Sequence, residues 1–123
     1  METLAEQLFF GIWRSYKTFK RLGNICLDTE TSFQEFTFST DRMLTIKFYE
    51  KGSIRTIVAT DQWVISLQKG RHFLAIVAPK MNFEVITVNH TVLVLVDTIS
   101  SEKTFFARNH HWVEYIKSNK SIV

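Results

Sequence analysis

The stretch QLFFGIWRSYKTF, residues 7–19, places five aromatic rings around one glycine near the start of the chain. Apolar residues at helix spacing precede this glycine, and Thr3 with Glu6 has the spacing of a capping box. We therefore expect a short helix over residues 3–9. It ends near the glycine and leads into an extended segment that carries Trp13.

Length and composition indicate a single globular domain. The chain has 123 residues, of which 46% are hydrophobic and 22% are charged, so it is too apolar for a disordered segment. We expect one domain over residues 1–123 with one core. The start METLAEQLFF lacks a basic leader, and no apolar run approaches the roughly 18 residues that cross a bilayer. These features favour a cytoplasmic protein with no membrane partner.

Several classes of function lack their sequence signatures. The net charge of +3 comes from scattered lysines and arginines, so no basic stripe indicates a nucleic-acid partner. The single cysteine excludes an internal disulfide, and no Cys/His spacing matches a zinc site. No nucleophile elbow, phosphate-binding glycine loop or paired-histidine helix motif occurs. We therefore expect no enzymatic activity, no metal and no cofactor.

The middle of the chain alternates apolar and polar residues in short runs separated by turn residues, which is typical of strands. Gly23 and Asn24 mark an early turn, and Asn109 is a candidate cap for a helix over residues 110–118. The other expected strands cover residues 33–39, 44–48, 63–67, 73–78, 83–88, 91–96 and 104–108, with one more beginning at Ser53.

Consecutive strands joined by short turns form an antiparallel meander, and closure into a barrel removes its exposed edges. The sequence therefore predicts an all-β fold. This is an antiparallel up-and-down β-barrel of eight or nine strands, with a short N-terminal helix and a short C-terminal helix. A β-sandwich is the alternative, but no long crossover connection is visible.

Three residues of this predicted barrel form a recognisable pattern. Gly11 and Trp13 after a short helix, together with Arg108 on the last expected strand, resemble the entry motif of lipocalins and related calycins. In that family the tryptophan closes one end of the barrel. An arginine of the final strand stacks on the ring and bonds to the backbone near the leading helix. The resemblance therefore implies a structural contact between Trp13 and Arg108.

The short chain without the common disulfide is similar to the compact lipocalin-like domains of bacteria. Fatty-acid-binding proteins, which rank second among the calycins, carry a helical lid after the first strand. The corresponding stretch RLGNICLDTETS, residues 21–32, has no periodic apolar face. An eight-stranded barrel of this kind either encloses one small ligand or is filled by its own side chains.

Turn length decides which side chains face the interior of the barrel. If Lys51 and Gly52 form a two-residue turn and Ile46 and Phe48 face inward, Arg55 also faces inward. Arg55 would then be a partner for a ligand carboxylate. A three-residue turn would instead place Ile54, Thr56 and Val58 on that face.

The same reasoning applies to the next hairpin. A turn formed by Lys69 and Gly70 places His72 on the face of Trp63 and Leu67, where it could orient a ligand.

The resemblance to the family also implies an alternation for the late strands. It places Ile86, Leu93 and Leu95 inside and, by parity with Ile86, directs Glu84 into the pocket. The outer face would then carry Phe83, Val85, Val92, Val94 and Val96. Such an apolar face needs a cover, either the terminal helix with Trp112 and Ile116 or the second subunit of a homodimer.

The sequence predicts a small lipocalin-like barrel that binds a hydrophobic or amphipathic molecule, such as a fatty acid, in its interior. The alternative is a barrel filled by its own aromatic rings, which acts as a structural or protein-interaction module. The candidate ligand-binding residues are Ile46, Phe48, Arg55, Trp63, Leu67, His72 and Leu93. The residues implied in barrel closure are Gly11, Trp13 and Arg108.

Overall fold

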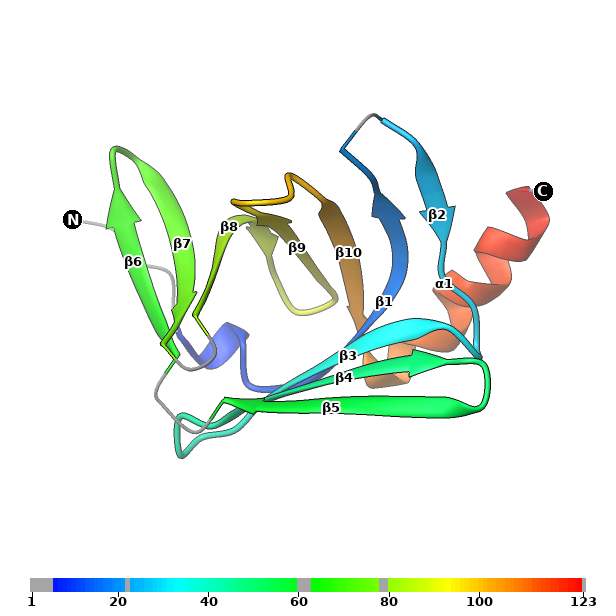
Figure 1. Cartoon of the computed structure of the whole chain (residues 1–123), viewed down its shortest axis with the longest axis horizontal. Helices are drawn as coiled ribbons and strands as arrows, with labels where there is room; N and C mark the ends of the chain where they lie inside the picture. Colours follow the sequence, from blue (N-terminus) through cyan, green and yellow to red (C-terminus); the bar gives the residue numbers. More distant parts are fainter. Residues whose placement is uncertain (1–5, 22, 60–62, 78–79, 123) are drawn as a thin grey trace.

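The computed structural model describes residues 6–21, 23–59, 63–77 and 80–122. These form one antiparallel sheet of ten strands, a single turn of 3-10 helix, η1 (Glu6–Leu8), and a C-terminal helix, α1 (Asn109–Ile122), as Figure 1 shows. The strands are β1 (Gly11–Phe19), β2 (Ile25–Leu27), β3 (Phe33–Phe38), β4 (Leu44–Glu50), β5 (Ser53–Ala59), β6 (Val64–Gln68), β7 (Arg71–Ile76), β8 (Met81–Val88), β9 (Val92–Asp97) and β10 (Lys103–Arg108).

The predicted all-β antiparallel class is confirmed, but the strand number and the closure of the barrel need correction. The sheet has ten strands rather than eight or nine, and its hydrogen-bonded path runs β5-β4-β3-β1-β10-β9-β8-β7-β6, with β2 beside β1. Within the described residues the path therefore ends at β5 and β6, and these two strands do not pair.

Strand direction explains why the ends of the sheet do not join. Every neighbouring pair on this nine-strand path is antiparallel, so the two end strands run in the same direction. Parallel neighbours need a crossover connection of about a dozen residues or more. Only four residues separate Ala59 at the end of β5 from Val64 at the start of β6.

Two hairpins have the predicted two-residue turns. Glu50 pairs with Ser53 around Lys51 and Gly52, and this register places Arg55 opposite Phe48. In the other hairpin, Leu67 pairs with His72 around Lys69 and Gly70. Both of these turn residues have a positive φ, 52° and 77°, as the tight turns favoured in hairpins require.

The predicted alternation is wrong in β8. Phe83 and Val85 belong to the interior core, whereas Ile86 is 45% exposed. The strand therefore has the phase opposite to the predicted one, and alternation from Val85 directs Ile86 outward. A β-bulge between Val85 and Thr87 changes the phase only beyond it, where Val88 packs against the core. Leu93 and Leu95 of the facing strand lie inside, as predicted.

The outward face of β8 also places Glu84 away from the interior. Its carboxylate pairs with Arg71 Nε at 3.2 Å, so Glu84 does not enter the pocket as parity with Ile86 predicted. The valines expected on the outer face next to it, Val92, Val94 and Val96, are buried or half-buried.

The two helices differ from their predicted positions. The first is shorter than the expected 3–9 segment and covers Glu6–Leu8, while residues 3–5 lie outside the described residues. The second, α1, packs mainly on β1 and β10, and not on the face of β8 and β9 that it was expected to cover. Trp112 Nε1 donates a hydrogen bond to the Ser15 carbonyl at 2.8 Å. The buried contacts under α1 come from Tyr16, Phe33, Ala107, Trp112 and Ile116.

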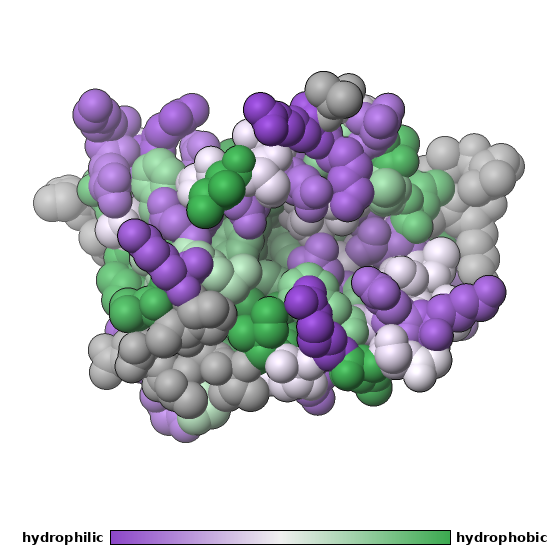
Figure 2. Space-filling model, in the orientation of Figure 1, coloured by the Kyte–Doolittle hydropathy of each residue, from purple (hydrophilic) through white to green (hydrophobic). Residues whose placement is uncertain are grey.

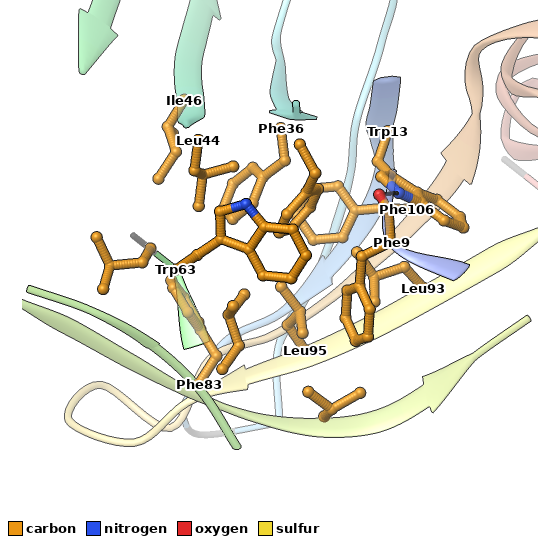
Figure 3. Packing of buried hydrophobic residues seen from close by; sticks show 14 residues of the cluster. Phe9, Trp13, Phe36, Leu44, Ile46, Trp63, Phe83, Leu93, Leu95 and Phe106 are labelled. Carbon is orange, nitrogen blue, oxygen red and sulfur yellow. Dashed lines mark hydrogen bonds between the residues drawn. The ribbon is translucent and has the colours of Figure 1, made fainter. Parts of the chain in front are cut away.

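The main core lies inside the curved sheet, and Figure 3 shows its side chains pointing inward from strands on both sides. Trp63 is fully buried and contacts three phenylalanine rings, with centroid distances of 5.1 Å to Phe38, 5.8 Å to Phe10 and 5.9 Å to Phe9. These rings fill the part of the interior beside η1.

Beside these rings, Arg108 at the end of β10 contacts Trp13 of β1 and the segment that precedes β1. The Arg108 guanidinium lies 4.0 Å from the centroid of the Trp13 ring, and its Nη2 donates to the Leu8 carbonyl at 2.6 Å. Its Nη1 donates to the Phe10 carbonyl. Trp13 Nε1 donates to the Phe9 carbonyl at 2.9 Å, a bond that Figure 3 draws. Three hydrogen bonds and a stacked cation therefore fix this end of the molecule.

We predict that Gly11→Ala destabilises the protein by about 3 kcal/mol, because it combines backbone strain with a steric clash. Gly11 has a φ of +115°, and a Cβ at this position would lie 2.7 Å from Arg108 Nη1. Urea unfolding measures the loss. Gly52→Ala is the matched control, since Gly52 also has a positive φ, +86°, but open space around its Cβ position.

The control should lose only the backbone contribution, about 1 kcal/mol. Equal losses for the two variants would show that the contact between Gly11 and Arg108 does not constrain the fold.

Candidate functional site

The interior changes from apolar to polar along several strands. Side chains two positions apart on a strand share one face, so each pair below occupies neighbouring levels of the interior. The pairs are Phe36 and Gln34 on β3, Leu95 and Asp97 on β9, and Phe106 and Thr104 on β10. In each pair the polar residue is the one farther from the Trp13 end.

A cavity of about 120 Å³ lies where the two levels meet. Its apolar walls come from both sides of the curved sheet, and its polar residues gather at the level of Gln34. The apolar lining consists of Phe36, Phe48, Met81, Phe83, Leu95 and Phe106, and the polar lining of Gln34, Asp97, Glu102 and Thr104. The interior is therefore filled beside Trp13 and hollow farther along the strands.

An outer groove of about 430 Å³ adjoins this cavity and shares Gln34, Phe48 and Glu102 with it. Figure 2 shows the surface hollowed between the walls of the sheet, with hydrophobic residues in the hollow and hydrophilic residues around it. The groove is also lined by Thr18, Lys20, Cys26, Leu27, Asp28, Ser32, Phe33, Tyr49, Glu50 and Arg55. It is the approach from solvent to the cavity.

Charged side chains surround this approach. Lys20 Nζ lies 3.5 Å from Glu102 Oε2, and both side chains are more than one-third exposed. The guanidinium of Arg55 lies 4.6 Å from the centre of the Phe48 ring. Asp97 Oδ1 accepts hydrogen bonds from the amides of Ile99 and Ser100, which order the turn between β9 and β10.

Asp28 holds the segments around the groove together. The Ser15 hydroxyl donates to its carboxylate, and the amide of Gln34 donates to the same Ser15 oxygen at 2.8 Å. These bonds connect β1, β3 and the segment after β2. Burial raises the pKa of Asp28 to about 6, although the Ser15 hydrogen bond and the charge of Lys20 act in the opposite direction.

The structure brings only part of the predicted ligand-binding set to this site. Phe48 lines both the cavity and the groove, and Arg55 lines the groove. Ile46, Trp63 and Leu93 are fully buried in the filled part of the core.

The remaining two predicted residues, Leu67 and His72, lie opposite each other in the hairpin of β6 and β7 and line neither space. His72 Nε2 is buried without a hydrogen-bond partner.

The acidic residues and Lys20 of the site were not predicted from the sequence, although the alternation of β9 points to one of them. Asp97 stands two residues after Leu95, which was expected to face inward, so alternation also directs Asp97 inward. From the sequence, Leu95 was assigned to the interior, but the alternation was not extended to Asp97. Lys20 and Asp28 lie outside any alternating run, and nothing in the sequence places them beside Glu102.

Two further features concern the described residues as a whole. Among them no group of three His, Cys, Asp or Glu side chains stands close enough to hold a metal ion. Their helices also include none with the length and apolar character needed to cross a membrane.

We predict that Asp28 makes the stability of the protein fall as the pH rises from about 4 to 7. The folded pKa near 6 lies above the usual value of 3.8, so the folded state keeps a proton that the unfolded state has lost. The stabilisation is complete below pH 4 and disappears as the pH passes 6. Its size is about 3 kcal/mol.

Urea unfolding of the protein and of Asp28→Asn across this range measures the effect. The protein should lose stability relative to the variant as the pH rises. Asp41→Asn is the control, because Asp41 lies on an exposed turn. A difference between the protein and Asp28→Asn that does not change with pH would contradict the burial of this carboxylate.

Comparison with known proteins supports the fold. No protein-family model matches the chain, and no curated protein is significantly similar in sequence. A redesigned β-barrel is structurally similar with a TM-score of 0.46 and 11% identity, covering 88% of this chain and 99% of that one. A lipocalin-like protein from Bacteroides uniformis has a TM-score of 0.58 and 14% identity, covering 82% of this chain and 98% of its own. The chain therefore has a lipocalin-like fold.

Proposed function

We propose that the chain binds a small hydrophobic or amphipathic molecule, with the apolar part in the cavity and the polar part in the groove. The observation that carries this proposal is the 120 Å³ space among Phe36, Phe83, Leu95 and Phe106. Protein interiors are close-packed, and voids larger than one water are rare. An apolar void with a polar rim that opens to a groove is typical of a ligand site.

The size of the cavity limits what it can hold. An engineered apolar cavity of about 150 Å³ binds benzene, so this cavity matches a benzene-sized group or a short alkyl chain. A fatty acid, the ligand class expected from the sequence, would place only a short part of its chain there. The rest would lie in the groove, whose volume is about 430 Å³.

A second candidate function rests on the filled part of the interior. The rings of Phe9, Phe38 and Trp63 pack against one another beside the Trp13 end, as expected for a barrel that serves as a structural or interaction module. Under that alternative the cavity holds only water. We further propose a non-enzymatic protein of the bacterial cytoplasm, and homodimerisation stays a prediction.

We predict that benzyl alcohol binds saturably in the cavity and that Leu95→Phe abolishes this binding. A titration followed by amide NMR should shift the signals of Phe36, Leu95 and Phe106. The added ring of Leu95→Phe occupies the cavity, and cavity-filling substitutions usually preserve or raise stability. Leu93→Met is the control, because Leu93 lies on the same face of β9 outside the cavity.

The control should bind the alcohol as the original protein does. Absence of saturable shifts in the folded protein, at ligand concentrations up to tens of millimolar, would support the filled-module alternative instead.

A further inference from the structure

The charge of the cavity lining indicates the chemistry of the ligand's polar end. Among the residues that line the cavity, the charged ones are Asp97 and Glu102, and both are acidic. The basic residues Lys20 and Arg55 line only the outer groove. A polar group at the cavity rim therefore meets carboxylates before it meets a cation.

The cavity and the groove taken together also carry a net negative charge. The cavity and groove together are lined by four acidic side chains, Asp28, Glu50, Asp97 and Glu102, and by two basic ones. With all of them ionised, this region carries an excess of two negative charges, although the whole chain carries +3. The entrance is thus opposite in sign to the rest of the molecule, which attracts cations toward it.

One carboxylate at the rim is available to a ligand. Glu102 lines both spaces, and in its ion pair with Lys20 the N···O distance is 3.5 Å between two partly exposed groups. An exposed pair of this kind contributes little, so a ligand cation can replace Lys20 at small cost. The rings of Phe36 and Phe106 line the same cavity, and an aromatic ring attracts a cation placed over its face.

We propose that the polar end of the ligand is an ammonium group, so that the site takes a small primary amine with a benzene-sized apolar part. This inference rests on the proposed function, because it concerns the same cavity. The apolar part lies among Phe36, Phe83 and Leu95, and the ammonium donates to Glu102 at the rim.

A carboxylate ligand fits the site less well. Its negative end would lie near Asp97 and Glu102 in a partly desolvated space, where like charges repel strongly. Arg55 is exposed, its guanidinium lies over the Phe48 ring, and it lines the groove but not the cavity.

Three probes with the same ring distinguish an ammonium ligand from a carboxylate ligand. They are benzylamine, benzyl alcohol and benzoate, which are cationic, neutral and anionic at neutral pH. Amide NMR titrations of the full chain measure each dissociation constant. We expect benzylamine to bind about fivefold more tightly than benzyl alcohol, and benzoate to bind most weakly.

Two charge variants test the assigned partner. Glu102→Gln should weaken benzylamine binding about threefold, and Lys20→Gln should strengthen it by a similar factor. In each variant the ratio of the dissociation constants of benzylamine and benzyl alcohol should change in this direction, because a change in the cavity itself would affect both probes together.

The outcomes are distinguishable. Binding of benzyl alcohol with no preference for benzylamine, or with benzoate as the tightest ligand, overturns the amine inference and leaves the proposed function standing. No binding of any probe to the folded protein overturns both. A preference for benzylamine that persists in Glu102→Gln overturns the assignment of Glu102.

Discussion

The contact of Arg108 with Trp13 determines how the rest of the molecule is arranged. One guanidinium stacks on the indole and donates to the carbonyls of Leu8 and Phe10, so it joins the last strand to the segment before the first. A planar cation with several donors suits this position, whereas a lysine would provide one point charge without the stacked plane. The aromatic core beside Trp13 packs against this fixed end.

The hollow half of the interior follows from the residues farther along the same strands. Large rings fill the space next to Trp13, but the interior positions continue as Gln34, Asp97 and Thr104, which are smaller and polar. These residues cannot close the space with apolar contacts, because burial of a polar group without a partner is costly. The same sheet therefore builds a rigid, packed end and an accessible cavity.

Part of this arrangement could be predicted from the sequence. Alternation and turn residues located the hairpins, including the turn at Lys51 and Gly52, and a short motif identified the pairing of Trp13 with Arg108. The inward phase of β8 was not predictable, because both of its alternating sets contain large apolar side chains, Phe83 and Val85 on one face and Ile86 on the other. The failure of the sheet to close depends on the directions of all strands, and no local pattern records it.

The division into a filled and a hollow half can be tested with a crystal structure of the protein under xenon pressure, since xenon enters apolar cavities without specific chemistry. The account predicts one xenon site between Phe36, Phe83 and Phe106, and none around Trp63. Absence of xenon there, with the phenylalanine rings closed over the space, would contradict it.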